Sequence, residues 1–182
     1  MKSLKKISET INSFIDRSIG SWKSIRSSHS LAFQEFENTN SNILISKINI
    51  DNKEVKDILL DFNFELIEPF AIKITWEAKS DWIEESTLKV DQATLIFSKI
   101  DAYSGHILRN KGYAELVKSR SNYYLDQKGG LNITTEYNST ISFERINFLS
   151  ENVRFRYSII KSKSNSSILQ TSHSSEIREL TI

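Results

Sequence analysis

The segment from Phe143 to Ser158 constrains the fold most, because it is typical of two strands joined by a short turn at Leu149–Asn152. Side chains of a strand alternate between the two faces of its sheet. One face of the first strand carries a carboxylate beside two apolar side chains: Glu144, Ile146 and Phe148. The second strand separates polar from apolar side chains completely, with Arg154, Arg156 and Ser158 on one face and Val153, Phe155 and Tyr157 on the other.

Two interpretations of this alternation remain open. In the more common one the apolar face points inward and the charges face water, since rows of charges are usually solvated. In the other, the sheet closes into a barrel wide enough to hold a ligand, and polar residues line its interior. Arg154 and Arg156 would then offer fork-shaped donors to two carboxylates of a bound molecule. The pattern alone does not choose between the two.

The rest of the chain predicts many short strands after one helix. Apolar residues recur at helical spacing from Ile7 to Trp22, which predicts an amphipathic helix over residues 1–19 that ends near Gly20. A short second helix is expected at Asn52–Phe62, with Asp51 as its N-cap. The ten expected strands cover residues 21–36, 43–50, 71–79, 92–100, 105–117, 122–125, 131–137, 142–149, 153–161 and 167–180, with a loop at 38–42.

Many short strands with regular turn signals indicate a sandwich or a barrel. An all-β, ten-stranded, antiparallel up-and-down barrel over residues 21–180, capped by the N-terminal helix, is the favoured prediction, because closure removes exposed sheet edges. Ten strands also leave an interior too wide for side chains alone to fill. At 182 residues the chain is expected to form a single domain, residues 1–182.

The composition of the chain argues against several classes of partner and of active site. The net charge of +1 gives no electrostatic argument for nucleic acid or an anionic membrane as partner. No apolar run approaches the roughly 20 residues that span a bilayer, and no secretory signal is recognisable. The absence of cysteine excludes disulfides, thiolate metal sites and a cysteine nucleophile, and it fits a reducing, cytoplasmic location.

Known catalytic patterns are missing. His29, His106 and His173 lie far apart without metal-ligand spacing, so no metal site is expected. The sequence has no dinucleotide-binding glycine motif, phosphate-binding loop or nucleophile elbow. An ordinary hydrolase or nucleotide-dependent enzyme is therefore not predicted.

What remains is a set of residues suited to holding a ligand. Trp76 shares a strand face with Ile74 and Ala78, and Arg26 lies on the first strand. With Glu144 and the arginine pair, these residues suit a flat, conjugated, doubly anionic molecule, which would stack on the indole and pair with the guanidinium groups. The alternatives are that Trp76 is a core residue and that Glu144 is an exposed partner of a basic side chain.

Several motifs, in order and spacing, resemble the S-type phycobiliprotein lyases, the CpcS/CpeS family. Gly20–Phe33 is similar to the opening pattern G-x-W-x-S-x-R-[ST]-x-H-x-L-[AS]-F. Later matches cover Thr75–Glu77, Gly105–Glu115, Leu131–Tyr137, Glu144–Phe148, Asn152–Ser158 and Ser174–Arg178. The likeness covers nearly the whole chain from Phe14, although Asn147 stands where the family usually has tryptophan.

The resemblance implies a barrel of the lipocalin or fatty-acid-binding type. It also implies binding of a phycobilin as a substrate, with no permanently bound cofactor, and transfer of that bilin to a cysteine of a phycobiliprotein subunit. The bilin-binding positions it implies are Arg26, Ile74, Trp76, Glu144, Arg154, Arg156 and Ser158. Of these, Glu144 and Arg154 are expected to be catalytic, with Glu144 on the pyrrole nitrogens and the arginines on the propionates.

Three hypotheses follow. In the first, the protein is a lyase that attaches phycoerythrobilin to a phycoerythrin β-subunit, and it could act as a homodimer. In the second, it is a non-catalytic carrier or chaperone of a bilin, porphyrin or fatty acid. In the third, the barrel is purely structural, for which an inward-facing pair of arginines would be a costly choice.

Overall fold

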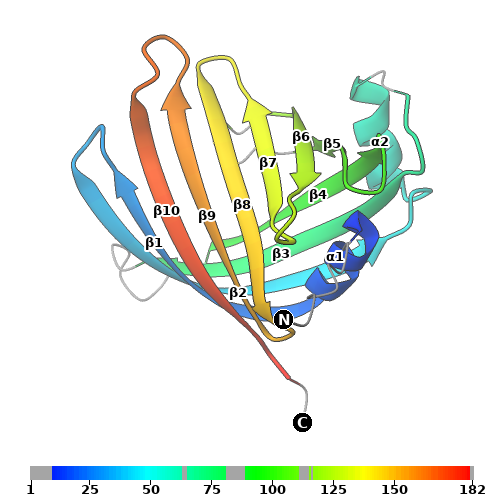
Figure 1. The fold of residues 1–182 in the computed structure, drawn as a ribbon, viewed down its shortest axis with the longest axis horizontal. Helices are drawn as coiled ribbons and strands as arrows, with labels where there is room; N and C mark the ends of the chain where they lie inside the picture. Colours follow the sequence, from blue (N-terminus) through cyan, green and yellow to red (C-terminus); the bar gives the residue numbers. More distant parts are fainter. Residues whose placement is uncertain (1–9, 63–64, 81–88, 111–114, 116, 181–182) are drawn as a thin grey trace, which may run out of the picture.

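Ten antiparallel strands close into one barrel in the computed structural model, which describes residues 10–62, 65–80, 89–110, 115 and 117–180 (Figure 1). Each strand pairs with the next along the chain, and the last closes on the first. The strands are β1 (Gly20–Ser30), β2 (Glu35–Ile48), β3 (Phe70–Ser80), β4 (Lys89–Lys99), β5 (Ser104–Arg109), β6 (Ser119–Leu125), β7 (Leu131–Glu136), β8 (Thr140–Ser150), β9 (Val153–Ser162) and β10 (Ile168–Arg178). The predicted up-and-down barrel is thus confirmed.

The register of β8 and β9 decides which face points inward. Glu144 lies opposite Ser158, and Phe148 lies opposite Arg154, so the carboxylate face of β8 and the arginine face of β9 are the same side of the sheet. Arg154 and Glu144 are each only 5% exposed. The polar face therefore lines the interior, as the second interpretation of the alternation predicted.

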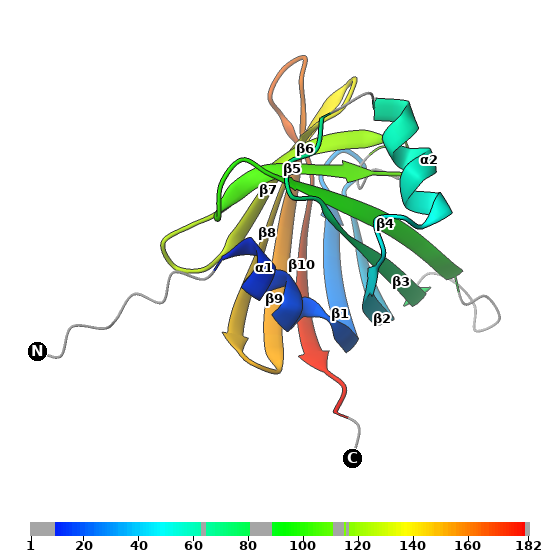
Figure 2. The same cartoon turned by 90° about the vertical axis from the view of Figure 1, so that its right-hand side faces the viewer.

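Helix α1 (Ile11–Ser18) closes one end of the barrel (Figure 2). Thr10 caps its first turn by accepting a hydrogen bond from the Ser13 amide, and Ile11, Phe14 and Ile15 are buried in the main apolar core. Residues 1–9 of the predicted helix lie outside the described residues. Gly20 has φ of 124° and begins β1, and a Cβ there would lie 2.8 Å from the Arg178 guanidinium, so glycine suits this close approach.

Helix α2 (Lys53–Phe62) packs on the outside of the barrel and forms a second, smaller core. Its apolar contacts are with the outward side chains of β3, β4 and β5: Ala71, Ile96 and Leu108. The predicted helix at Asn52–Phe62 is confirmed apart from its cap. The side chain of Asn52, not Asp51, accepts a hydrogen bond from the Glu54 amide at 2.9 Å.

Several predicted strand boundaries were wrong, and the strand expected over residues 21–36 ends at Ser30. The expected loop at residues 38–42 lies inside β2, because β1 and β2 form one long hairpin whose pairing runs from Gly20–Ile45 to Ser30–Glu35. The turn of that hairpin falls at residues 31–34, where Gln34 has φ of 56°. The strand expected over residues 105–117 ends at Arg109, and residues 111–114 and 116 lie outside the described residues.

Candidate functional site

All seven predicted binding residues face the interior of the barrel. They come from four strands: Arg26 on β1, Ile74 and Trp76 on β3, Glu144 on β8, and Arg154, Arg156 and Ser158 on β9. Arg26 and Arg156 lie level with each other on either side of β10, because Ser174 of β10 is opposite both residues. Neighbouring strands are about 4.8 Å apart, so the backbones of Arg26 and Arg156 are separated by roughly 10 Å.

The interior remains open to solvent. The side chains of Arg26 and Arg156 point inward, yet they are 32% and 29% exposed. Ile74 and Trp76 are also only partly buried. Helix α1 fills one end with buried apolar side chains, whereas these four inward-facing residues remain in contact with solvent.

One carboxylate on β10 forms ion pairs with both arginines of β9. Glu176, which is 1% exposed, accepts a hydrogen bond from Arg154 Nε at 2.5 Å and lies 3.5 Å from Arg156 Nη2. Burial lowers the pKa of the Arg154 guanidinium, the carboxylate of Glu176 opposes this, and the charges of Arg156 and Arg178 lower it further. This part of the wall thus holds more guanidinium groups than carboxylates.

Glu144 has a different partner. Arg109, at the end of β5, donates from Nη2 to Glu144 Oε1 at 2.9 Å, and the two side chains are 8% and 4% exposed. A buried carboxylate is stable only when it is paired and hydrogen-bonded. Glu144 is therefore a buried partner of Arg109 and not an exposed partner of a basic side chain.

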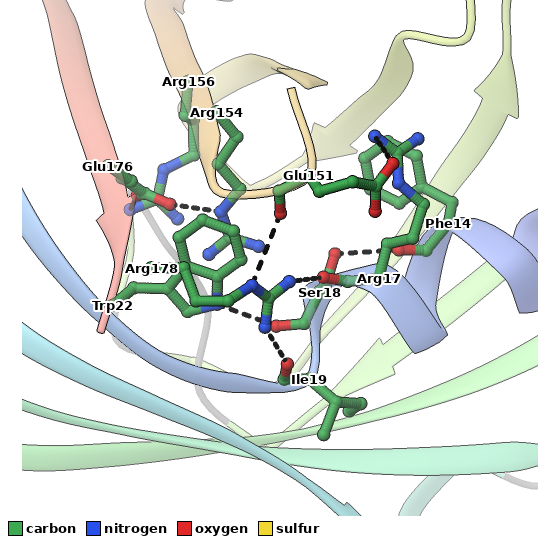
Figure 3. A network of polar contacts seen from close by, with 10 residues as sticks. All are labelled: Phe14, Arg17, Ser18, Ile19, Trp22, Glu151, Arg154, Arg156, Glu176 and Arg178. Carbon is green, nitrogen blue, oxygen red and sulfur yellow. Dashed lines mark hydrogen bonds and ion pairs between the residues drawn. The ribbon is translucent and has the colours of Figure 1, made fainter. Parts of the chain in front are cut away.

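The arginine cluster is tied to the closed end of the barrel by Trp22 (Figure 3). The guanidinium groups of Arg154 and Arg178 lie 4.2 and 4.3 Å from the Trp22 ring. Arg178 in turn donates to the backbone oxygens of Ile19 at 2.6 Å and of Arg17, at the carboxyl end of α1. Helix α1, which plugs the closed end of the barrel, is thus connected by direct contacts to the inward-facing arginines.

Hydroxyl groups fill the wall beyond the arginines. Ser158 pairs with Ser172 at 2.8 Å, and Ser121 pairs with Thr135 at 2.7 Å. Among the buried donors that lack a hydrogen-bond partner in the described part of the chain are Ser28 Oγ, Ser142 Oγ and Arg109 Nε. Buried polar groups normally find a partner, so this region is suited to water or the polar groups of a ligand.

Sequence reasoning selected no role for Arg109, Trp22, Glu176 or Arg178, although all four lie within the matched motifs. The available signals were the charges of Arg109, Glu176 and Arg178 and, for all four residues, the family resemblance. Their partners lie on other strands, and those pairings follow only from the closed barrel.

Within the described residues, no cluster of His, Asp or Glu could hold a metal ion. His29 contacts Phe36, His106 bonds Asn122 at 2.9 Å and His173 contacts Tyr157. No described helix is long and apolar enough to cross a membrane.

The fold and the inner wall define a class first: a closed, ten-stranded antiparallel β-barrel whose inward face carries arginine, tryptophan and serine. Comparison with known proteins then identifies the family. The family model of CpeS-like proteins matches residues 10–179. The S-type phycobiliprotein lyase CpeS of Guillardia theta has a similar structure, with a TM-score of 0.83, 30% identity and coverage of 99% of both chains.

Curated relatives agree with this family. Chromophore lyase CpcS/CpeS 3 of Trichodesmium erythraeum is 37% identical over 92% of this chain and 98% of its own length. A putative phycoerythrobilin lyase CpeS of Microchaete diplosiphon is 32% identical over 82% of this chain and 67% of its own. The chain belongs to the CpcS/CpeS family of S-type chromophore lyases, and its enzyme class is that of a lyase.

Proposed function

We propose that this protein binds phycoerythrobilin inside the barrel and attaches it, through a thioether bond, to a cysteine of a phycoerythrin β-subunit. One observation carries the proposal: an inward-facing wall in which Arg154 and Arg156 share a single carboxylate, with Arg26 two strands away and 4.0 Å from Glu37. Three guanidinium groups against two carboxylates leave a surplus of positive charge, which suits a ligand with two carboxylates. The name of the Microchaete relative supports the choice of bilin.

Arg26 and Arg156 make the first contact with the two propionates in this proposal. Both are partly exposed inside the cavity, so a carboxylate can approach them without unfolding the wall. Arg154 is 5% exposed and bonded to Glu176, so it acts at closer range, once the ligand is seated. Trp76 and Ile74, on the other side of β1 and β2, provide an apolar surface for the conjugated system.

Glu144 accepts hydrogen bonds from the pyrrole N–H groups. Its Oε1 is bound by Arg109, which leaves Oε2 for the bilin. A carboxylate at the pyrroles favours the protonated, more electrophilic chromophore. The acceptor thiolate then adds to the exocyclic ethylidene carbon of ring A: a C–S bond forms, the electron pair moves into the ring system and a proton completes the addition without any leaving group.

The chain itself mainly supplies geometry. Holding ring A at the opening and excluding other orientations can contribute several orders of magnitude in effective concentration. The bilin is a substrate that leaves with the acceptor, not a resident cofactor. We further propose that the protein acts in the cytoplasm, which agrees with the absence of cysteine, and that it can work as a homodimer.

Co-expression tests the proposal. The chain is produced together with enzymes that make phycoerythrobilin and with a phycoerythrin β-subunit, and covalent labelling is read as zinc-induced fluorescence on a denaturing gel. We expect a fluorescent acceptor band that requires this protein and disappears when the acceptor cysteine is replaced. The Glu144→Gln variant should bind bilin with an altered visible spectrum and transfer it poorly.

Other outcomes would replace the proposal. A coloured complex of this protein that never labels an acceptor would favour the carrier hypothesis. Labelling only with phycocyanobilin and its acceptor would assign the protein a specificity for phycocyanobilin instead of phycoerythrobilin.

A further inference from the structure

Trp22 packs against two cations at once. The guanidinium carbons of Arg154 and Arg178 lie 4.2 and 4.3 Å from its ring, and the residue is only 1% exposed. Cations are attracted to the face of an indole, and the attraction is larger where water is excluded. The ring thereby stabilises two like charges, of which Arg154 is 5% exposed and Arg178 is partly exposed, against their mutual repulsion.

The helix side of this stack is fixed by main-chain contacts. Trp22 Nε1 donates to the Ser18 carbonyl at 2.9 Å, and Arg178 donates to the Ile19 carbonyl at 2.6 Å and to the Glu151 carbonyl at 3.3 Å (Figure 3). The last carbonyls of a helix lack intrahelical donors and attract cations. The end of α1 therefore sets the position of the indole.

The cavity side of the stack leads to the candidate ligand contacts. Arg154 rests on Trp22 and donates to Glu176 at 2.5 Å, and Glu176 lies 3.5 Å from Arg156, whose side chain is 29% exposed in the cavity. Each step is a direct contact. A displaced indole would release Arg154, and Glu176 and Arg156 would rearrange with it.

We infer that Trp22, seated by Arg178 on the end of α1, is a positioning residue for the arginines that receive the carboxylates of the ligand. The inference rests on the proposed function and deepens it, because it assigns the plug of the barrel a part in substrate recognition. Trp22 and Arg178 do not touch the ligand in this scheme; they act through Arg154 and Glu176.

The test compares two ligands that differ only at the carboxylates. Phycoerythrobilin and its dimethyl ester are titrated into the full-length protein, and dissociation constants are read from visible absorption. For Trp22→Phe and for Arg178→Met we expect the free acid to bind about fivefold more weakly, which is the scale of one cation–π contact. Binding of the ester should be unchanged within error.

A control separates positioning from general loss of stability. Phe97→Leu removes a 1% exposed ring that packs on Phe70 and Tyr123, and circular dichroism confirms that each variant is folded. This variant should leave the dissociation constants of both ligands unchanged or raise both by the same factor. If Trp22→Phe and Arg178→Met likewise weaken acid and ester to the same extent, or neither, Trp22 is only structural and the inference fails.

The wild-type protein distinguishes failure of the inference from failure of the proposed function. If it binds acid and ester equally well, the arginines do not recognise carboxylates, and the proposed ligand contacts are wrong. If it prefers the acid but both variants keep that preference, only the role of Trp22 and Arg178 is wrong.

Discussion

The buried ion pair between Arg109 and Glu144 makes a quantitative test of the interior possible. Arg109→Met would keep much of the side-chain length and leave the Glu144 carboxylate, 4% exposed, without its 2.9 Å partner. Breaking a buried pair from one side costs about 3–5 kcal/mol, because an uncompensated charge remains. In a domain of this size, 3 kcal/mol corresponds to a fall in Tm of roughly 6–12 °C.

The double variant Arg109→Met with Glu144→Leu removes both charges. We expect it to be more stable than Arg109→Met alone, since a buried pair can often be replaced by apolar side chains at little cost. The sum of the two single losses should exceed the double loss by about 1–3 kcal/mol, as is usual for residues in direct contact. This excess measures the coupling across the barrel between β5 and β8.

Urea unfolding, followed by tryptophan fluorescence and by circular dichroism, supplies the four free energies. The matched control is Lys47→Met, which removes the partner of Asp16 in an ion pair of 2.7 Å whose side chains are 66% and 58% exposed. An exposed pair contributes less than about 1 kcal/mol. If Arg109→Met costs no more than Lys47→Met, the Arg109–Glu144 pair is hydrated rather than buried, and our account of this pair is refuted.

Three further predictions concern stability. Burial, aided by the charge of Asp101, raises the pKa of Tyr123 to about 12, so the free energy of unfolding should fall between pH ~10 and ~12. Tyr123→Phe should resist this loss, and absorbance at 295 nm follows the titration of the phenol. The Thr94 hydroxyl and the Lys73 ammonium lower the pKa of Glu54 despite partial burial, so the contribution of Glu54 to the free energy of unfolding is complete above pH ~4.3 and is lost on further acidification. In urea titrations at several pH values, Glu54→Gln should therefore show a smaller loss of stability in acid. Gly105→Ala should cost about 1–3 kcal/mol in the same assay, because a Cβ would lie 2.1 Å from the Ser98 carbonyl oxygen.

Strand alternation predicted which residues of β8 and β9 share a face, because alternation depends on local geometry alone. Once Glu144 pairs with Ser158, every second residue of β8 and β9 faces the same side. Closure of the barrel then placed that side inside, which no local pattern could decide. The choice needed the count of strands and the family resemblance.

The misplaced loop at residues 38–42 has an equally physical cause. Asn, Thr and Ser favour turns when considered locally. Here Thr39 pairs with Arg26 and Ser41 pairs with Ser24, so their backbone groups are satisfied by β1 and the polar side chains are tolerated in a long hairpin. Tertiary pairing overrides the local preference.

The ion pairs could not be predicted for a different reason. Arg109 and Glu144 are 35 residues apart, and Arg154 and Glu176 are 22 apart. The second pair connects neighbouring strands, but the first connects β5 with β8, which are not adjacent in the sheet. Alternation shows that a side chain points inward and says nothing about which inward side chain it meets.

The placement of charge divides stability from binding within one cavity. Arg109 and Arg154 are buried and each has a carboxylate partner within 3 Å, so the fold depends on them. Arg26 and Arg156 are about a third exposed, and the carboxylates of Glu37 and Glu176 lie farther from them, at 4.0 and 3.5 Å, so much of their desolvation is deferred until a ligand carboxylate replaces the water. Arg156→Gln should therefore weaken bilin binding about tenfold or more while the free energy of unfolding changes by less than about 1 kcal/mol. Paired titration and urea unfolding check this, and equal losses in both would show that Arg156 supports the wall instead of receiving the ligand.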